Sequence, residues 1–493
     1  MATRIGIAEL MESSGVKFGT SGARGLVSAL TDRVAYAYAA GFLGYLERAG
    51  RLAPHARLAL GGDLRSSTER ILTAVARAVA DRGHEPVYAG RLPSPALMLY
   101  GTDHHIPSIM VTGSHIPDDR NGIKFNTADG EITKNDEEGI RREVVELPEV
   151  FAADGNFRAD APFKLPVATS EPTRRYIARW LSAFPRTLLA GRRVAVYGHS
   201  AVGRDVAVEI LEGLGAEVLR LGWSERFISV DTEAIRPEDV ELSLGWAKEH
   251  GFFALVSSDG DSDRPLFADE SGRFVRGDVA GVLTARFLGA TFVAAPVSCN
   301  TALERSGWFR TQRTRIGSPY VIEAMVQAAQ AGTAGVVGYE ANGGFLSATE
   351  LSVPGGGTLS PLPTRDPVVV QLSILASAVR ANTAVSALLR DLPQRFTQSD
   401  RLPEFPTELA RQKLSELSQG GRSAMQGAFA ELGELASSDE VDGLRMTFES
   451  GEVLHIRASG NAPELRCYVE ADTEARAGAL LRYGLKTLAG FRS

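Results

Sequence analysis

Three aspartates in one short segment are the most chemically informative feature of this chain. Asp259, Asp261 and Asp263 alternate with other residues just after the apolar run 252–256. Residues two apart in an extended chain project to the same side, so the three carboxylates are expected to lie together. They would repel one another without a cation, and few carboxylates completed by water and phosphate suit Mg²⁺. The segment therefore predicts a magnesium site.

A calcium-binding loop of the EF-hand type is an alternative for the same segment. Glu270 falls at the twelfth position counted from Asp259, where such a loop has its bidentate glutamate. However, Arg264 stands where that loop needs glycine, Pro265 follows, and a strand rather than a helix precedes the segment. A solvated acidic turn is a third interpretation. The spacing favours a metal site over both.

A serine after a second apolar run is the candidate nucleophile. Ser114 follows residues 107–111, and a side chain just after a buried strand is fixed yet accessible. Because a serine hydroxyl is a weak nucleophile, it needs a base or a charged partner. Nearby polar residues that could serve are His115, Asp118, Asp119 and Lys124. An ordinary strand-to-turn connection is the alternative, since Gly, Ser, Asn and Pro are common turn residues.

Two further segments carry groups suited to a phosphorylated sugar. Glu340 lies among glycines in residues 338–344, where its carboxylate could accept hydrogen bonds from vicinal sugar hydroxyls, although a plain turn with one exposed acid is the favoured interpretation of this segment taken alone. Residues 457–466 concentrate donors, because arginine matches phosphate oxygens in a bidentate way and a glycine-rich turn can present backbone N–H groups. The donors there are Arg457, Ser459, Asn461, Arg466 and the backbone around Gly460. A hairpin with exposed arginines is the alternative for this segment.

The bulk composition limits the class of protein. A chain of 493 residues is too long for one hydrophobic core and predicts three or four domains. A net charge of −7 argues against nucleic-acid or membrane-surface binding. With two distant cysteines, no apolar stretch of about 18 residues and no secretory signal, we expect a cytoplasmic protein.

The elements that must position these groups follow one repeated pattern. Residues 56–89, 193–219 and 291–338 each read as strand, polar turn, amphipathic helix and strand. This predicts three related α/β domains with mixed, largely parallel sheets. The last hundred residues contain a hairpin and a helix over 473–488, which indicates a smaller α+β domain. The predicted domains are 1–160, 161–275, 276–390 and 391–493, with connections at 157–172, 268–277 and 391–406.

Taken together, these segments resemble the α-D-phosphohexomutases, most closely the bacterial phosphomannomutase/phosphoglucomutase group. The likeness extends over essentially the whole chain and includes residues 18–25 and 121–125 besides the segments above. It implies four domains around a central cleft, with Ser114 carried as phosphoserine. It also implies that Mg²⁺ is held by Ser114 and the three aspartates, and that hexose 1,6-bisphosphate (glucose 1,6-bisphosphate) is the intermediate and activator.

The resemblance also assigns residue roles. Arg24 and Lys124 match positions near the transferring group, and His115 lies beside the nucleophile. The substrate-binding residues that it implies are Arg264, Glu340, Asn342, Arg457, Ser459, Gly460, Asn461 and Arg466. The chain departs from the common pattern in reading Gly-Ser-His-Ile-Pro around Ser114 and at four other positions: Ser318, Asn342, Gly344 (where relatives often have histidine) and Asn461.

The expected activity is the interconversion of hexose 6-phosphate and hexose 1-phosphate by a monomer or weak dimer. Mannose is favoured over glucose, because the Gly-Ser-His-Ile-Pro sequence most resembles phosphomannomutases. Phosphoglucosamine mutase is disfavoured, since its relatives usually have an acidic residue where Ser21 stands. Two other classes stay open: a Mg²⁺-dependent sugar phosphatase, and an inactive sugar-phosphate-binding protein. The expected partner is a small phosphosugar, without nucleic acid or membrane.

Overall fold

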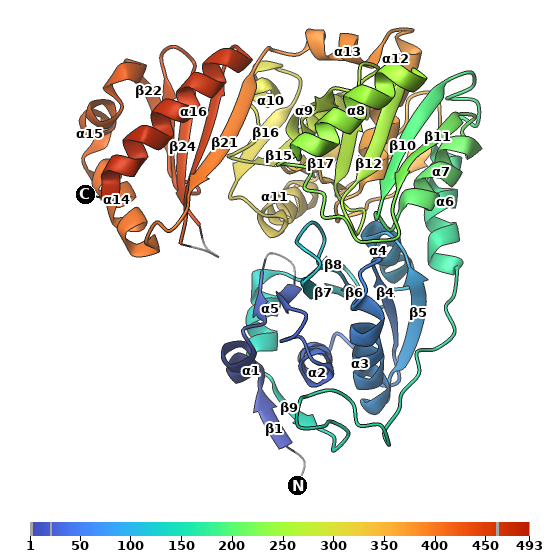
Figure 1. The fold of residues 1–493 in the computed structure, drawn as a ribbon. Helices are drawn as coiled ribbons and strands as arrows, with labels where there is room; N and C mark the ends of the chain where they lie inside the picture. Colours follow the sequence, from blue (N-terminus) through green and yellow to red (C-terminus); the bar gives the residue numbers. More distant parts are fainter. Residues whose placement is uncertain (1–2, 20–21, 460–462, 493) are drawn as a thin grey trace.

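The fold is seen in a computed structural model, which describes residues 3–19, 22–459 and 463–492 (Figure 1). The first sheet has seven strands in the order β2-β3-β7-β6-β4-β5, with β8 paired to β7. Its strands are β2 (Lys17–Phe18), β3 (Gly22–Leu26), β4 (Arg57–Gly62), β5 (Glu85–Arg91), β6 (Ser108–Val111), β7 (Arg120–Thr127) and β8 (Gly130–Glu131). The helices of this region are α1 (Ile7–Ser14), α2 (Asp32–Arg48), α3 (Thr68–Asp81), α4 (Ser94–Asp103) and α5 (Lys134–Arg141), and β1 (Thr3–Gly6) pairs with β9 (Val144–Leu147).

The second and third sheets follow along the chain. The second has the order β11-β10-β12-β13-β14 and the third β16-β15-β17-β18. The second contains β10 (Arg193–His199), β11 (Glu217–Trp223), β12 (Ala254–Ser258), β13 (Pro265–Ala268) and β14 (Phe274–Val275), with α6 (Glu171–Ala183), α7 (Arg204–Gly213) and α8 (Pro237–His250). The third contains β15 (Phe292–Pro296), β16 (Arg310–Thr314), β17 (Val336–Tyr339) and β18 (Phe345–Ser347). Around it lie α9 (Gly277–Phe287), α10 (Ala302–Arg305), α11 (Ser318–Gln330), α12 (Pro367–Arg380), α13 (Val385–Leu388), η1 (Leu389–Asp391) and the ribbon β19 (Leu351–Ser352) with β20 (Thr358–Leu359).

These three sheets repeat one strand arrangement. In each, three parallel strands have the first strand in the middle, and a fourth strand runs antiparallel beside the third: β5-β4-β6-β7, β11-β10-β12-β13 and β16-β15-β17-β18. The expected mixed sheets are confirmed, with the parallel part confined to three strands in each. The turn between the third and fourth strands therefore has the same place in all three sheets. Ser114, the three aspartates and Glu340 lie on these three turns.

The C-terminal sheet is entirely antiparallel, in the order β21-β25-β24-β23-β22. It contains β21 (Phe396–Leu402), β22 (Leu435–Asp439), β23 (Leu444–Phe448), β24 (Val453–Ala458) and β25 (Leu465–Ala471). The helices are α14 (Thr407–Gln419), α15 (Gly421–Ala428), η2 (Ala430–Leu432), α16 (Glu474–Ala489) and η3 (Gly490–Arg492). The predicted hairpin, third strand and final helix are confirmed.

Two of the predicted connections are wrong. Within 268–277, β13 and β14 form a hairpin that extends the second sheet, and the Asp269 carboxylate closes its turn by accepting from Ser271 and Arg273 N–H groups. The residues of this turn resemble a linker in sequence, because turns and linkers are both rich in polar residues. Within 391–406, β21 is an edge strand of the C-terminal sheet, and its polar sequence carries no alternating apolar pattern. Residues 159–169, in contrast, have almost no regular structure, as predicted.

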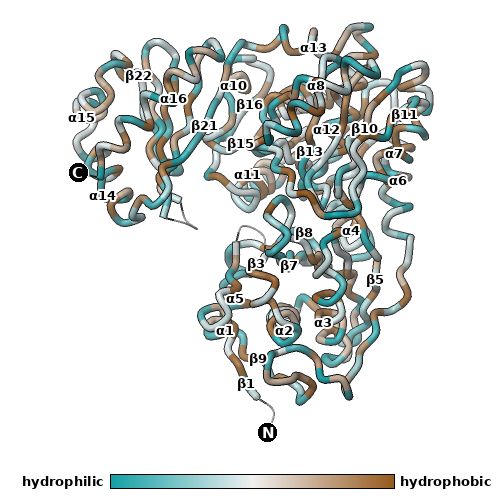
Figure 2. Tube along the Cα trace, viewed as in Figure 1, coloured by the Kyte–Doolittle hydropathy of each residue, from teal (hydrophilic) through white to brown (hydrophobic). Residues whose placement is uncertain are grey.

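The hydrophobic cores explain how the sheets hold together. One continuous cluster of buried apolar residues runs from α4 through α6 and the second sheet to the third sheet and α12. Figure 2 shows the hydropathy of the chain along these elements. A second cluster packs α2 and α3 against the first sheet, and a third lies within the C-terminal region. Because the first three sheets share buried apolar side chains, the turns that they carry are held in a fixed relation to one another.

No single helix of the described chain has the length and apolar composition to cross a membrane. By length and composition alone, one pair of helices bent by 91° would qualify as a membrane span: Pro367–Arg380 together with Val385–Asp391.

Candidate active site

The turn after β6, residues 112–119, holds Ser114 in a strained and buried conformation. Ser114 has a φ of 55°, a left-handed value that costs a residue other than glycine about 1 kcal/mol. Its backbone N–H donates to Thr112 Oγ1 at 2.8 Å, and the Thr112 hydroxyl donates to Asp63 Oδ2 at 2.8 Å. A strained residue at a turn persists only where the surroundings fix it. Here the residues that follow β4 supply that support.

Arg65 fixes the rest of this turn. Its Nε donates to Asp63 Oδ2 at 3.2 Å, and its two terminal nitrogens donate to four backbone carbonyls of the turn region. The acceptors are Ser114 (3.0 Å), Ile116 (2.5 Å), Pro117 (2.7 Å) and Arg120 (2.9 Å). The guanidinium, which is fully buried, also stacks on Phe227 at 3.9 Å from the ring centroid. Four of the five N–H donors of this side chain therefore hold the Ser114 turn region, and the fifth binds Asp63.

Replacing Arg65 by lysine tests this support. Arg65→Lys keeps the charge but loses the fork, so several buried carbonyls lose a donor at about 1 kcal/mol each. We expect a lower unfolding temperature and a kcat reduced by about tenfold or more, because a misplaced nucleophile reacts slowly. Thermal unfolding and steady-state kinetics measure both. Arg77→Lys on the surface of α3 is the control, and equal effects in the two variants would contradict a special role for Arg65.

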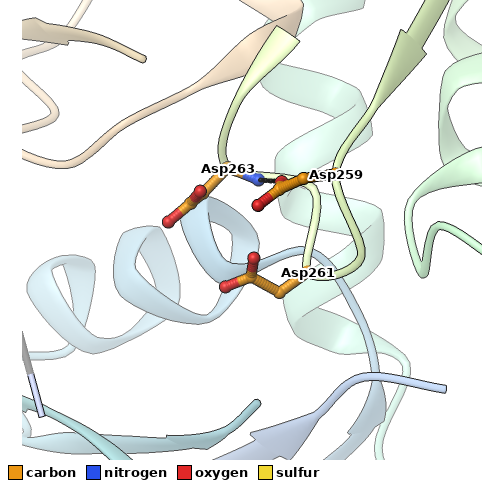
Figure 3. Close-up of side chains that lie close together, drawn as sticks. All are labelled: Asp259, Asp261 and Asp263. Atoms are coloured by element: carbon orange, nitrogen blue, oxygen red, sulfur yellow. Dashed lines mark hydrogen bonds between the residues drawn. The ribbon is translucent and has the colours of Figure 1, made fainter. Parts of the chain in front are cut away.

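The turn between β12 and β13 gathers the three aspartates (Figure 3). One oxygen of each lies within 4.8 Å of the others, and all three side chains are buried. Protein donors already engage both oxygens of Asp259 and one oxygen each of Asp261 and Asp263. Asp259 Oδ1 accepts the N–H groups of residues 263 and 264, both at 3.2 Å. Asp261 Oδ2 accepts from Ser94 Oγ (2.7 Å) and Lys124 Nζ (2.5 Å).

The remaining oxygens fit a metal. Asp263 Oδ2 accepts from Lys124 at 2.7 Å, while Asp261 Oδ1 and Asp263 Oδ1 are buried and have no hydrogen-bond partner among the described residues. Buried carboxylate oxygens without a donor are costly unless a cation binds them. The disfavoured EF-hand alternative is excluded, because the Glu270 carboxylate binds the backbone N–H and hydroxyl of Ser386 instead. The donor set of oxygens suits Mg²⁺.

The charges of the site are strongly coupled. Burial, together with Asp261 and Asp263, raises the pKa of Asp259 well above its usual range. Burial also acts to raise the pKa of Asp263, but nearby Arg365 and Lys124 outweigh it and the pKa falls. For Lys124, burial acts to lower the pKa and the two aspartates reverse that effect. Lys124 therefore stays charged beside Asp261 and Asp263.

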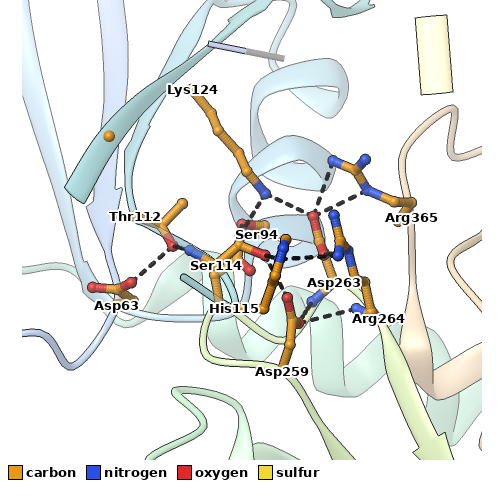
Figure 4. A network of polar contacts seen from close by, with 12 residues as sticks. Asp63, Ser94, Thr112, Ser114, His115, Lys124, Asp259, Asp263, Arg264 and Arg365 are labelled. Atoms are coloured by element: carbon orange, nitrogen blue, oxygen red, sulfur yellow. Dashed lines mark hydrogen bonds and ion pairs between the residues drawn. The ribbon is translucent and has the colours of Figure 1, made fainter. Parts of the chain in front are cut away.

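The Ser114 turn and the aspartate turn meet at the serine hydroxyl (Figure 4). Ser114 Oγ donates to Asp259 Oδ2 at 2.5 Å and lies 3.3 Å from His115 Nδ1. That nitrogen lies 2.9 Å from Arg264 Nη1, and burial with the Arg264 charge lowers the pKa of His115 to about 3. A neutral His115 that accepts from Arg264 fits this arrangement. Arg24, on β3, is electrostatically coupled to Arg264: burial and then the Arg264 charge lower the pKa of Arg24 to about 10.

The turn after β17 places Glu340 and Asn342 next to the aspartates. Glu340 Oε2 accepts from Arg365 Nη1 at 3.3 Å, and Arg365 Nε donates to Asp263 Oδ2 at 3.1 Å. The Asn342 side-chain oxygen accepts the Gly344 N–H at 2.9 Å, and its backbone carbonyl accepts from Thr232 Oγ1 at 2.8 Å. The side-chain oxygen of Asn342 is thus engaged in shaping the turn.

The predicted phosphate-binding residues of the C-terminal sheet lie apart from this group. Arg457 Nε donates to Asp442 Oδ1 at 2.9 Å, and Arg466 pairs with Glu464 at 3.5 Å. Within the described chain, no hydrogen bond or ion pair joins either arginine to Ser114 or to the aspartates. Ser459 is buried. Gly460 and Asn461 lie outside the described residues.

Sequence reasoning missed several residues that support the site. Asp63 and Arg65 follow β4 in Gly-Gly-Asp-Leu-Arg, and this charged pair after a buried strand was the available signal. Ser94 lies at the N-terminus of α4, where its hydroxyl reaches Asp261. Arg365 precedes α12 and is far in sequence from its partners, so no local pattern points to it.

Comparison with known proteins adds the family. The descriptions "Phosphoglucomutase/phosphomannomutase, alpha/beta/alpha domain I", "domain III" and "C-terminal domain" match residues 15–150, 276–396 and 409–482. A phosphomannomutase of Sinorhizobium fredii is 44% identical over 474 residues, covering 96% of this chain and 99% of the relative. This chain belongs to the phosphoglucomutase/phosphomannomutase family. It is an enzyme, a phosphohexomutase.

Two further relatives agree with this assignment. A phosphomannomutase of Salmonella muenchen is 38% identical to the enzyme and covers 94% of each chain. A structure described as a putative phosphomannomutase of Thermus thermophilus has a TM-score of 0.72 with 20% identity, covering 96% of this chain and 99% of the other. The latter likeness supports the four-part α/β fold of the enzyme.

Proposed function

We propose that this phosphohexomutase interconverts mannose 6-phosphate and mannose 1-phosphate, with glucose phosphates as secondary substrates. The observation that carries the reaction is the 2.5 Å contact between Ser114 Oγ and Asp259 Oδ2, within a buried group of three aspartates and Lys124. A nucleophile placed against a metal-ligand set is what phosphoryl transfer requires, because that reaction depends on positioning and charge neutralisation.

Ser114 is the proposed carrier of the phosphoryl group. In the first transfer the bond between phosphorus and Ser114 Oγ breaks and a bond to a sugar hydroxyl oxygen forms, which yields a hexose 1,6-bisphosphate. The proton of the sugar hydroxyl ends on Ser114 Oγ. The second transfer returns the other phosphoryl group to the serine. Arg24 and Lys124 are proposed to bind the transferring group, since both are cations near the Ser114 turn.

Asp259, Asp261 and Asp263, together with a phosphate oxygen on Ser114, are proposed to hold Mg²⁺. When bound, this ion neutralises charge on the transferring phosphoryl group. Arg264 and His115 lie beside Ser114 and Asp259 and are proposed to orient the phosphate through their N–H groups. Burial of Ser114 excludes water, which would hydrolyse a phosphoserine.

Glu340 and Asn342 are proposed to bind sugar hydroxyls, and residues 457–466 the phosphate that is not reacting. Glu340 is supported by its position on the turn next to the aspartates. For Arg457, Ser459, Gly460, Asn461 and Arg466 the support is the dense set of donors on one turn. To bind the phosphate that is not reacting, residues 457–466 must approach the Ser114 turn when substrate binds.

Mannose is preferred in this proposal because the relatives from Sinorhizobium fredii and Salmonella muenchen, which are 44% and 38% identical to this chain, are both named phosphomannomutase. A competition experiment tests it. Mannose, glucose and glucosamine 1-phosphates are mixed with the enzyme, Mg²⁺ and a trace of glucose 1,6-bisphosphate, and phosphorus NMR follows the products. We expect 6-phosphates, with mannose 6-phosphate forming fastest. Accumulation of inorganic phosphate would indicate a phosphatase, and persistence of all 1-phosphates an inactive binding protein.

Other properties stay predictions with their own measurements. Glucose 1,6-bisphosphate as activator is checked by the lag in turnover when it is omitted. The cytoplasm is supported by two buried free thiols, Cys299 and Cys467. A monomer or weak dimer is checked by light scattering, and the four domain boundaries by limited proteolysis.

A further inference from the structure

Arg365 occupies a position that no local sequence pattern indicates, between turns of all three α/β sheets. Its side chain is 3% exposed. Besides Asp263 and Glu340, its Nη2 lies 3.5 Å from Glu131 Oε1 on β8, and its Nη1 donates to Ser318 Oγ at 3.2 Å. One guanidinium thus contacts three buried carboxylates, one from the first sheet, one from the aspartate turn and one from the Glu340 turn.

The path of this side chain depends on Gly344. A Cβ atom built on Gly344 would lie 2.5 Å from Arg365 Cγ and 2.6 Å from its Cδ, closer than real side chains approach. The backbone of Gly344 is not left-handed, so other residues could adopt its conformation. Glycine is therefore needed here for space rather than for backbone freedom. The space is filled by Arg365.

The two buried cations, Lys124 and Arg365, bind different sets of carboxylates that share Asp263. Lys124 binds Asp261 and Asp263, whereas Arg365 binds Asp263 and Glu340. Figure 4 shows Lys124 and Arg365 on either side of the Asp263 carboxylate. Without Arg365, Glu340 and Glu131 would be two buried carboxylates lacking this cation, close to a site that attracts divalent ions. Glu340 would then be drawn toward the metal rather than held for the sugar. Among the described residues, the hydrogen bonds of Lys124 go to Asp261 and Asp263, and none joins it to Glu340.

We infer that Arg365, admitted by Gly344, is a positioning residue that reserves Glu340 for the sugar and links the sugar-binding turn to the metal-binding turn. Arg365 acts through Asp263 and Glu340. This inference rests on the proposed function of Glu340. It predicts that loss of Arg365 impairs sugar recognition while metal binding is kept or strengthened.

A double-mutant cycle tests the inference with Gly344→Ala, Arg365→Ala and the double variant. Each single variant is expected to lower kcat/KM for the preferred hexose 1-phosphate by at least about thirtyfold, mainly through KM. Because alanine at 365 has no Cγ, the double variant should be within about threefold of Arg365→Ala. Additive losses would overturn the Gly344–Arg365 coupling. Gly427→Ala is the control, since nothing lies within 4 Å of its Cβ position.

Two further measurements separate positioning from a merely structural role. Electron paramagnetic resonance with Mn²⁺ alone should show Arg365→Ala binding the ion at least as tightly as the unaltered enzyme, and weaker binding would overturn the inference. Deoxy hexose phosphates lacking one hydroxyl at a time should be discriminated less by Arg365→Ala, and unchanged discrimination would likewise overturn it. If the unaltered enzyme shows no mutase activity, the proposed function fails, while thermal unfolding of the cycle still tests the Gly344–Arg365 coupling.

Discussion

Ser114→Ala should reduce mutase turnover by about 10⁴-fold or more, because it removes the proposed phosphoryl carrier. The fold should survive, since the turn is held by Arg65, Thr112 and the backbone rather than by the Ser114 hydroxyl. Phosphorus NMR measures turnover, and intact-protein mass shows whether the phosphoryl group has gone.

Ser373→Ala is the matched control for this variant. Ser373 is a fully buried serine on α12, and its hydroxyl has no hydrogen-bond partner among the described residues. We expect its activity to equal that of the unaltered enzyme. Near-normal turnover by Ser114→Ala would disprove the phosphoserine mechanism. The family assignment would stand, but this chain would then need a different phosphoryl carrier.

Asp261→Asn should weaken metal binding by at least about tenfold, because it removes one of three buried carboxylate charges. Turnover should fall with it and recover in part at high Mg²⁺ concentration. The side chain keeps its shape, and Lys124 keeps its contact with Asp263. Mn²⁺ titration by electron paramagnetic resonance gives the affinity, and steady-state kinetics at several Mg²⁺ concentrations gives the recovery.

Asp205→Asn, at an exposed position at the start of α7, controls for a general change in charge. An unchanged Mn²⁺ affinity in Asp261→Asn would show that the aspartate turn is not the metal site. A loss of turnover that high Mg²⁺ does not relieve at all would indicate a role for Asp261 in holding Lys124 or Ser94 instead.

The strands and helices of this chain were largely predictable because their signals are local. Apolar runs of four to seven residues followed by polar turns gave β4, β10 and β15 within two residues of their observed starts. The exceptions were β14, which has only two residues, Phe274 and Val275, and is too short for a periodic pattern, and β21, which is polar and lacks an apolar run. Each is recognised only by its pairing, β14 with β13 and β21 with β25.

The candidate site was predictable where its groups are close in sequence. The grouping of Asp259, Asp261 and Asp263 was predicted from their spacing in an extended chain, whereas the structure groups them on a turn. Ser114 and Glu340 were marked by their positions after strands. The supports were not predictable, since Arg65 binds the Ser114 turn from about 50 residues away and Arg365 binds Asp263 from about 100. A guanidinium whose acceptors are far away in the sequence produces no regular spacing of residues by which it could be recognised.

The sequence by itself determined the element pattern, the reactive side chains and the family, because each depends on residue type and local spacing. Only the tertiary structure decided that three equivalent turns of three repeated sheets meet, and that one oxygen of Asp261 and one of Asp263 are left without a hydrogen-bond donor. It also showed that Gly344 makes room for Arg365. These features depend on packing between segments far apart in the chain, where a distance of a few ångströms is set by the shared core and not by any neighbouring residue.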